Sequence, residues 1–426
     1  MKNFYILLLL TITFISCDKN EEAEAALTIS SIYPTTGPTG TIVMLTGTGF
    51  STTISENEVT LNNIPVKVNK ATSKSLSVAI PARAGIGKII VRVKGAITES
   101  TTPFTHITTA MVSTLAGSTR GFADGIGTQA QFTEIVQMMV APDGSLYATD
   151  QSNDKIRKIS PSGVVSTFAG STRGHSDGVG LNAQFTIPSG IVLGSDGIFY
   201  VSEFHQIRTI TGNGVVGTLA GSRDKYGDLD GPGATAQLYG PFNIDRAANG
   251  NLYVSDIYNY KIRQIAPDGT VSTLAGGGES GHNNGTGIQA KFFNPSGIKV
   301  GTDGNVYVTE YASIRKITPA GVVTTFAGGE YGYADGNLTT AKFRDPYGMT
   351  LASDGTMYVA DTQNNKIRKI STDGQVTTLA GSEKGYRDGL GEQAMFHWPV
   401  GIAIASDSIL YVSEGGNFKI RKIVLR

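Results

Sequence analysis

Short stretches of alternating apolar and polar residues, separated by turn signals, fill the chain from about residue 112 to its end. In one such region these stretches are 190–193, 198–202, 206–210 and 215–220. A period of two indicates β-strands, because it places the apolar side chains on one face. Asp196-Gly197 and Asn213-Gly214 stand between them and favour hairpins, since both turn residues need positive φ. The pattern predicts antiparallel units of four strands.

This unit recurs six times. A phrase of the form Val-x-Thr-Leu/Phe-Ala-Gly begins at residues 112, 165, 216, 271, 323 and 376. A second phrase, related to Lys-Ile-Arg-Lys-Ile, keeps step with it. A period near ~50 residues indicates an array of one supersecondary unit, and four antiparallel strands per unit predict a six-bladed β-propeller. We expect features shared by all six copies to be architectural, and features that differ to carry function.

The two ends of the repeat region predict how the propeller closes. The first copy begins at its fourth strand, 111–116, and the last copy stops after its third strand, 419–426. Pairing of these two segments would complete the ring. It would also hide both sheet edges, which otherwise invite aggregation.

The segment 27–108 lacks the long repeat and is punctuated by Gly and Pro. Its predicted strands are 27–32, 41–46, 58–61, 64–68, 75–80 and 88–93. The phrase Ile32-x-Pro34-x-x-Gly37-x-x-Gly40, followed by Leu-Thr-Gly-Thr-Gly-Phe at 45–50, resembles the opening of an IPT/TIG immunoglobulin-like domain. The resemblance implies a two-sheet sandwich that serves as a rigid spacer. No constellation of catalytic groups stands out in this segment.

The repeated region also resembles a known family. Phrases such as Leu252-Tyr-Val-Ser-Asp256 followed by Lys261-Ile-Arg263 are similar to NHL repeats, and the resemblance spans residues 111–426. It implies the propeller fold, but NHL propellers include both enzymes and binding modules, so it leaves function open. The predicted fold class is therefore all-β, an Ig-like β-sandwich followed by a six-bladed β-propeller closed by its N-terminal and C-terminal strands.

The first 26 residues resemble a bacterial export and anchoring signal. Residues 4–15 are apolar but too few to span a membrane. Residues 1–17 end in Cys17, the only cysteine, and resemble the lipobox of bacterial lipoproteins. This implies cleavage before Cys17 and its lipidation, with an ordinary signal peptide as the alternative. The acidic tether 18–26 resembles a signal for the outer face of some outer membranes, with a solvated linker as the alternative. We expect an outer-membrane protein, lipid-anchored and facing the cell exterior.

Composition narrows the classes of function. The chain has 426 residues, no formal net charge and 16% charged residues, below the ~25% of an average domain. No basic patch stands out, so nucleic acid is not an expected partner. If Cys17 is acylated, no thiol remains, which excludes disulfides and thiol catalysis.

An acid ends the second strand of every blade, and an arginine follows in the third strand. The acids are Asp150, Glu203, Asp256, Glu310, Asp361 and Glu414, and the arginines are Arg157, Arg208, Arg263, Arg315, Arg368 and Arg421. A ring of carboxylates could bind a cation or polarise a substrate. Because both partners occur in all six copies, we favour a structural ring of ion pairs.

A loop phrase such as Gly121-Phe-Ala-Asp-Gly125 also repeats between blades. Calcium is one interpretation of these oxygen-rich loops, but Asn284 replaces the acid in one copy. That replacement favours a turn, since Asp and Asn both suit the left-handed conformation. The five histidines show no metal-ligand spacing. Gly174-His-Ser-Asp-Gly178 has the letters of GxSxG, but it is one copy of the repeated inter-blade loop phrase, so no nucleophile elbow is predicted. We predict no cofactor, metal ligand or catalytic residue, and leave open a bound calcium or other metal.

The hairpins joining second to third strands share one rim with the long inter-blade loops, whereas the opposite rim carries only tight turns. The loop-rich rim is therefore the expected working face. Exposed aromatic rings can stack on the apolar faces of sugars. The rim aromatics predicted to bind a ligand are Tyr258, Tyr260, Phe204, Tyr311 and Trp398. The alternative is that these rings pack between blades.

Taken together, the sequence predicts a non-catalytic, cell-surface glycan-binding lipoprotein. It resembles accessory lipoproteins that bind polysaccharide or oligosaccharide beside an outer-membrane transporter complex, so such a complex is an expected partner. One alternative is a metal-assisted lyase or hydrolase that uses carboxylates at the propeller channel. A further alternative is a protein-interaction scaffold.

Overall fold

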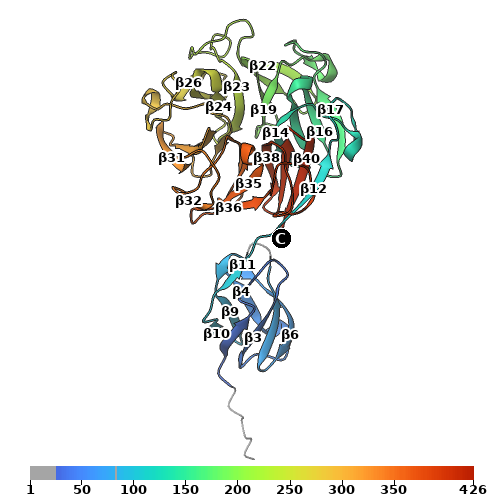
Figure 1. Cartoon of the computed structure of the whole chain (residues 1–426), viewed down its shortest axis with the longest axis vertical. Helices are drawn as coiled ribbons and strands as arrows, with labels where there is room; N and C mark the ends of the chain where they lie inside the picture. Colours follow the sequence, from blue (N-terminus) through green and yellow to red (C-terminus); the bar gives the residue numbers. More distant parts are fainter. Residues whose placement is uncertain (1–24, 82–83) are drawn as a thin grey trace, which may run out of the picture. The chain divides into compact units, whose positions relative to one another are not determined.

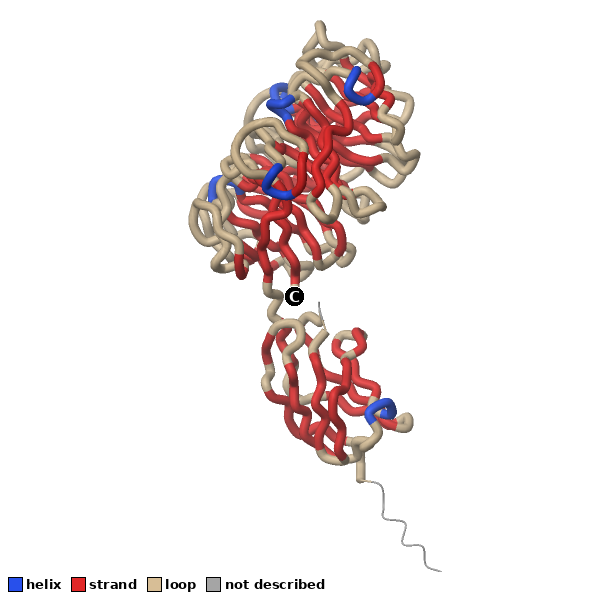
Figure 2. Tube along the Cα trace, turned by 90° about the vertical axis from the view of Figure 1, so that its right-hand side faces the viewer, coloured by secondary structure: helices blue, strands red, loops and turns tan. Residues whose placement is uncertain are grey.

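The structure, a computed structural model, describes residues 25–81 and 84–426. The chain divides into two compact units between residues 107 and 108, and both are built from β-strands (Figures 1 and 2). The predicted lipidation site Cys17, with residues 1–24, lies outside the described residues. In the part of the chain that the structure describes, no helix has the length and apolar character needed to cross a membrane.

The first unit is a β-sandwich. One sheet has the order β1 (Thr28–Tyr33), β3 (Ile42–Thr48), β7 (Ser75–Ala79) and β6 (Lys67–Thr72). The other has the order β10 (Ala96–Glu99), β9 (Ile89–Val93), β4 (Glu58–Leu61) and β5 (Ile64–Pro65), and β2 (Thr36–Gly37), β11 (Phe104–His106) and β8 (Ile86–Gly87) form a small third sheet. The segment 64–68, expected to be one strand, is divided between β5 and β6 in different sheets.

Alternating burial along β3 explains this sandwich. Val43 and Leu45 are fully buried, whereas the residues between them face outward. Leu61, Leu76 and Val91 from both sheets join them in one apolar core. The burial of this alternating set supplies the main stabilisation of the unit.

The second unit is a propeller of six blades, each with four antiparallel strands. The first three blades are β14 (Ile135–Val140), β15 (Leu146–Asp150), β16 (Lys155–Ile159) and β17 (Val164–Ala169); β19 (Pro188–Leu193), β20 (Phe199–Glu203), β21 (Gln206–Ile210) and β22 (Val215–Gly221); and β23 (Pro241–Arg246), β24 (Leu252–Asp256), β25 (Lys261–Ile265) and β26 (Val271–Ala275). The fourth and fifth are β28 (Ile298–Val300), β29 (Val306–Glu310), β30 (Ser313–Ile317) and β31 (Val322–Gly328); and β33 (Pro346–Leu351), β34 (Met357–Asp361), β35 (Lys366–Ile370) and β36 (Gln375–Ala380). The sixth is β38 (Pro399–Ser406), β39 (Ile409–Glu414), β40 (Lys419–Leu425) and β12 (Ala110–Ala116).

Short elements complete the described chain. Two-residue strands add to the outer edges of five blades and are β13 (Gly125–Ile126), β18 (Gly178–Val179), β27 (Gly285–Thr286), β32 (Gly336–Asn337) and β37 (Gly389–Leu390). Single 3₁₀ turns occur at η1 (Ile54–Glu56), η2 (Gly127–Gln129), η3 (Gln151–Asn153), η4 (Gly180–Asn182), η5 (Ile257–Asn259), η6 (Gly287–Gln289) and η7 (Thr362–Asn364).

The sixth blade joins the two ends of the propeller segment. Strand β12 pairs antiparallel with β40, with Val112 opposite Ile423 (Figure 1). The innermost strands contact one another in the cycle β14, β19, β23, β28, β33, β38 and back to β14. The ring is thus continuous, and the pairing of the first and last segments is the one the sequence predicts.

Apolar clusters between neighbouring blades hold the ring together. In one of them, Ala130 and Phe132 of an inter-blade loop pack with Ile135 of the first blade and with Tyr411 and Ile420 of the sixth. Equivalent phenylalanines at 185, 292, 343 and 396 are also fully buried. Five of the six long inter-blade loops are therefore anchored by a buried phenylalanine, and in the loop between the second and third blades the buried Leu238 takes this place. These anchors fix the loop-rich rim.

Candidate functional site

All six acid–arginine pairs are formed beneath the loop-rich rim. Their N–O distances are 2.7 Å for Arg157–Asp150, 2.6 Å for Arg208–Glu203, 2.8 Å for Arg263–Asp256, 2.7 Å for Arg315–Glu310, 2.7 Å for Arg368–Asp361 and 2.9 Å for Arg421–Glu414. All twelve side chains are buried. Burial raises the pKa of Glu203 to about 7, although Arg208 opposes the shift.

The loop acids form a second set of partners for the arginines. Arg157 Nη2 donates to Asp124 Oδ1 at 2.7 Å, and Asp124 also accepts from the backbone and hydroxyl of Thr167. In the fourth blade Asn284 Oδ1 takes this place, 2.8 Å from Arg315 Nη2. The sequence predicts only turns for these residues, whereas in the structure they also bind the arginines. The signal was present, because the loop residue recurs in step with the arginine.

The ion-pair ring leaves its carboxylates no free side. Asp150 Oδ2 accepts from Arg157 at 2.7 Å and from Asn153 at 2.9 Å, while Oδ1 accepts from the backbone N–H groups of Thr133 and Glu134. Among the described residues, no group of three or more His, Cys, Asp or Glu is arranged to hold a metal. The strand-end carboxylates that a metal-assisted enzyme would use at the channel are thus engaged elsewhere.

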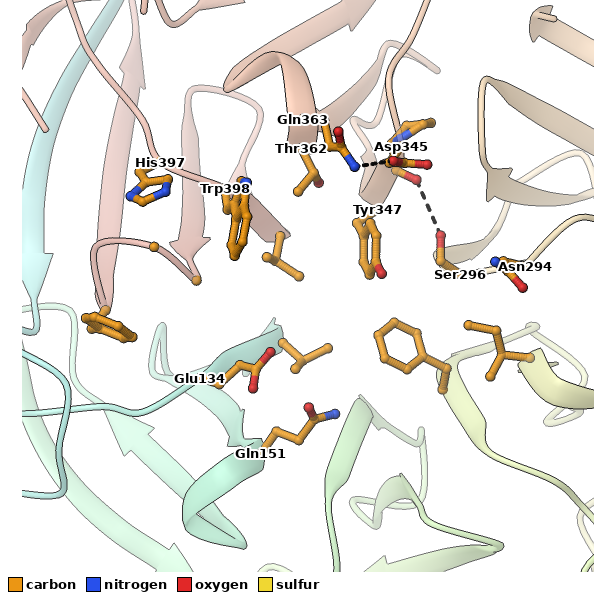
Figure 3. A pocket seen from close by; sticks show the side chains of 18 of the residues that line it. Glu134, Gln151, Asn294, Ser296, Asp345, Tyr347, Thr362, Gln363, His397 and Trp398 are labelled. Carbon is orange, nitrogen blue, oxygen red and sulfur yellow. Dashed lines mark hydrogen bonds between the residues drawn. The ribbon is translucent and has the colours of Figure 1, made fainter. Parts of the chain in front are cut away.

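A cavity of about 1000 Å³ opens above this ring. Its walls come from five of the six blades, so it lies on the axis of the propeller, and we call it the axial pocket. The residues following the second strands contribute Gln151, Ile257, Tyr311 and Thr362. The starts of the first strands contribute Val136, Phe242, Tyr347 and Val400, and Ser296 lies two residues before β28. Figure 3 shows Trp398, Tyr347, Glu134 and Gln151 around the same space.

Aromatic rings form much of the wall. Trp398 is 52% exposed. Phe242 and Tyr347 meet edge to face, with ring centroids 5.8 Å apart. Tyr311 stacks on Tyr331 at 4.7 Å and an interplanar angle of 20°. Apolar faces held in fixed orientations are typical of small-ligand pockets.

Polar groups stand between these rings. Asp345 Oδ2 accepts from Gln363 Nε2 at 2.5 Å and from Tyr331 Oη at 3.3 Å (Figure 3 draws the first bond). Burial raises the pKa of Asp345. Gln151 donates to Ser189 at 2.8 Å, which leaves its carbonyl oxygen for another partner. The pocket therefore combines apolar faces with hydrogen-bond acceptors.

The ion-pair ring also positions part of the pocket. Glu414 Oε1 accepts from the backbone N–H of His397 at 2.8 Å, and Glu310 Oε2 accepts from that of Phe293 at the same distance. Both His397 and Phe293 line the pocket. The shared acids thus hold loops whose side chains differ from blade to blade.

Backbone strain is concentrated at the rim. Ile187, Asn294, Asp345 and Trp398 each precede a proline and have φ of 53°, 50°, 46° and 53°. Positive φ is uncommon for side chains other than glycine. Hydrogen bonds hold the conformation: Trp398 N donates to Asn365 Oδ1 at 3.0 Å, and Asp345 N donates to the Tyr311 carbonyl at 2.7 Å. Such strain gathers at functional sites, and three of these four residues line the pocket.

Comparison with known proteins identifies both units. Residues 27–106 match the IPT/TIG domain family. The chain is 25% identical over 328 residues to the NHL repeat-containing protein 2 of Homo sapiens, across 65% of this chain and 44% of that protein. The chain carries an IPT/TIG domain and an NHL-type propeller. Both resemblances drawn from the sequence are thereby confirmed.

A further relative of the NHL-type propeller is the protein SUPPRESSOR OF QUENCHING 1, chloroplastic, of Arabidopsis thaliana. It is 30% identical over 286 residues, across 62% of this chain and 27% of that protein. The chain therefore spans less than half the length of these two relatives.

Three solved structures share the architecture. They are a Bacteroides thetaiotaomicron protein of unknown function (TM-score 0.64, 20% identity, 95% of this chain and 99% of that one), an auxiliary nutrient binding protein from the same organism (0.58, 21%, 94% and 98%), and a putative phosphatase also from it (0.58, 18%, 93% and 97%). At these identities the likeness extends to the fold alone.

The structure divides the five predicted ligand-binding aromatics of the NHL-type propeller into groups. Tyr311 and Trp398 line the axial pocket. Phe204 and Tyr258 lie outside it, in a second set of rings. Tyr260 belongs to neither group: it is half-buried, has φ of 53° and ends a 3₁₀ turn.

Several pocket residues were not predicted as site residues, among them Asp345, Glu134 and Gln151. The available signal was the repeat itself. Asp345 and Glu134 occupy the position before the first strand, and Gln151 the position after the second-strand acid, where residue type changes from blade to blade. Sequence alone did not reveal that these positions face the propeller axis.

Proposed function

We propose that the protein is a non-catalytic, cell-surface glycan-binding protein and that the axial pocket is its binding site. The observation that supports this most directly is the exposed Trp398 ring beside acceptor groups, in a cavity of about 1000 Å³. Pockets of this size, mostly apolar with a few placed polar groups, suit small organic ligands.

The chemistry of a sugar matches these walls. One face of a pyranose ring is lined by C–H groups and packs on an aromatic ring, as Trp398 offers. Its hydroxyl groups donate hydrogen bonds, and Asp345, Glu134 and Gln151 provide acceptors around the cavity. Phe242 and Tyr347 supply a further apolar surface.

The cellular setting is part of the same proposal. One protein of similar fold is described as an auxiliary nutrient binding protein of Bacteroides thetaiotaomicron, which supports a binding role in a cell envelope. The lipobox resemblance at Cys17 would anchor the chain in the outer membrane, and the IPT/TIG domain would space the propeller from it. We propose that it assists polysaccharide or oligosaccharide uptake beside an outer-membrane transporter.

Glycan screening followed by calorimetry tests the proposal, with protein lacking residues 1–26. Trp398→Ala should weaken binding of the selected oligosaccharide about tenfold, because one aromatic stacking contact is lost. Trp398→Phe should retain part of the affinity. Ile288→Ala removes an exposed apolar side chain outside the pocket and should leave the affinity unchanged. Equal affinity for wild type and Trp398→Ala would refute the site assignment.

The same preparation addresses the enzymatic alternative. Elemental analysis after purification without added ions, combined with product analysis of the selected glycan, should detect neither a stoichiometric metal nor cleavage. Cleavage that depends on a tightly bound metal would replace the proposed function with that of a lyase or hydrolase.

A further inference from the structure

A second set of aromatic rings lies outside the axial pocket. It consists of Phe204, His205, Tyr226, Tyr239 and Tyr258, which we call the aromatic cluster. Successive ring centroids are 3.8 Å apart for Phe204–His205, 5.0 Å for His205–Tyr226, 4.8 Å for Tyr226–Tyr239 and 5.0 Å for Tyr239–Tyr258. Tyr226 is 59% and Tyr258 61% exposed. The cluster therefore presents Phe204, Tyr226, Tyr239 and Tyr258 to solvent around the buried ring of His205.

Local backbone geometry builds this arrangement. Phe204 has φ of 32°, in the short hairpin of the second blade. Gly240 has φ of 68°, and a Cβ at this position would overlap the Tyr258 ring. Gly240 N donates to the Phe204 carbonyl at 3.1 Å, and Tyr258 N donates to the Tyr239 carbonyl at 3.2 Å. The backbones of the second and third blades thus fix the rings together.

The polar ends of the cluster make few hydrogen bonds within the described part of the protein. The hydroxyls of Tyr226, Tyr239 and Tyr258 have no hydrogen-bond partner among the described residues. At the centre His205 is buried, and its Nδ1 atom has no partner there either. Burial lowers the pKa of His205, so the imidazole is neutral at neutral pH. The surface therefore offers uncharged rings and free hydroxyls.

The aromatic cluster and the axial pocket adjoin across the third blade. Ile257 lines the pocket, and the next residue, Tyr258, belongs to the cluster. Phe242 lines the pocket, and Tyr239, three residues earlier, belongs to the cluster. A chain leaving the pocket over this blade would meet the aromatic rings directly.

We propose that the aromatic cluster is a second carbohydrate subsite, so that the propeller holds a neutral polysaccharide chain in two places, the axial pocket and the cluster. This inference rests on the proposed function of the pocket. Free hydroxyls beside ring faces match alternating C–H faces and hydroxyls of a pyranose chain better than they match a wholly apolar partner. Two linked contacts also raise affinity for a polymer without any new contact chemistry, because the second contact forms at high effective concentration.

The test compares a polymer with its own short fragment. Affinity gels and calorimetry are run with amylopectin, laminarin, galactomannan and xylan, and with the tetrasaccharide of any polymer that binds. We expect Tyr226→Ala/Tyr258→Ala to weaken polymer binding about tenfold more than tetrasaccharide binding. Trp398→Ala should weaken both. The doubly conservative Tyr226→Phe/Tyr258→Phe variant keeps the rings and should lose only part of the polymer affinity.

The outcomes separate the two proposals. Unchanged polymer affinity in the double alanine variant, together with loss in Trp398→Ala, would overturn the second subsite and leave the pocket. Wild-type protein that binds none of the polymers or fragments would overturn both. The subsite would also be overturned if Tyr226→Ala/Tyr258→Ala lost binding to a peptide or protein partner and kept its affinity for the polymer. The thermal unfolding midpoint should be unchanged in the variants, and Tyr226→Phe/Tyr258→Phe provides the comparison if the alanine variant unfolds.

Discussion

The ion-pair ring and the axial pocket occupy neighbouring positions of the same repeat but follow opposite rules. An acid ends the second strand in all six blades, and every one of these acids meets a buried arginine. The next residue differs in every blade and is Gln151, Phe204, Ile257, Tyr311, Thr362 or Gly415. The residues repeated in all six blades thus form the scaffold, whereas the residues that differ between blades give the rim an uneven surface.

The largest effect should come from breaking the ring. Arg368→Ala leaves Asp361 buried without its cation and removes a partner of Asp335. Removal of one member of a buried pair costs about 3–5 kcal/mol of unfolding free energy. Gln363→Ala, an exposed pocket residue five positions earlier, should cost less than about 1 kcal/mol. Urea denaturation measures both, and equal losses would contradict the division between scaffold and rim.

A smaller effect should follow from reshaping the pocket without touching the ring. A Cβ on Gly416 would overlap the His397 ring, so Gly416→Ala must displace a residue that lines the pocket. We expect oligosaccharide affinity to fall about tenfold, a change of ~1.4 kcal/mol. At Gly212 the added methyl would meet no atom within 4 Å. Calorimetry should therefore find wild-type affinity in Gly212→Ala, and the same loss in both variants would contradict the assignment.

The same contrast explains what sequence could and could not reveal. Spacing predicted the six blades and the ion pairs, since each repeats in register. The sequence also predicted Trp398 and Tyr311 as ligand-binding aromatics of the rim. It did not show that Ile257 and Tyr258, adjacent in the chain, belong to different surfaces. That depends on the left-handed backbone of Gly240 and on the third blade's loop contacts.

Tyr226 is a second example of a site residue that the sequence could not reveal. It lies in a long loop without periodic apolar positions, and only the folded loop brings it 5.0 Å from His205 and 4.8 Å from Tyr239. Asp345 is similar, because its proximity to Gln363 and Tyr331 arises from three separate segments. Contacts of this kind are set by tertiary packing, which no local pattern encodes.

The pH dependence of the unfolding free energy should show that His205, although it lies at the rim, is buried in the folded protein. Burial lowers the pKa of His205 below its ordinary value, near 6.5. As pH falls below that value, the unfolded chain takes up a proton more readily than folded His205, so the unfolding free energy decreases. In urea denaturation, the unfolding free energy of His205→Phe should decrease less steeply between about pH 8 and about pH 5 than that of the wild type, because this range spans the ordinary pKa of histidine. Identical slopes would mean that His205 is protonated equally in both states.

The smallest expected effect comes from exchanging the loop residues of the fourth and fifth blades. Asn284 lies 2.8 Å from Arg315 Nη2, where Asp335 lies 2.7 Å from Arg368 Nη2. Both loop side chains are exposed, so solvent screens the added charge. Asn284→Asp should raise the unfolding free energy by less than about 1 kcal/mol and Asp335→Asn should lower it by a similar amount.

Measurements of these two variants at different salt and calcium concentrations distinguish ion pairing with the arginines from cation binding by the loops. Both changes should shrink at high salt, because exposed ion pairs are screened, and neither should depend on added calcium if the loop residues serve the arginines. Stabilisation of the wild type by calcium that disappears in Asp335→Asn would instead assign the repeated loops to cation binding. In that case the shared residues would carry recognition as well as architecture, and the separation between ring and pocket would no longer hold.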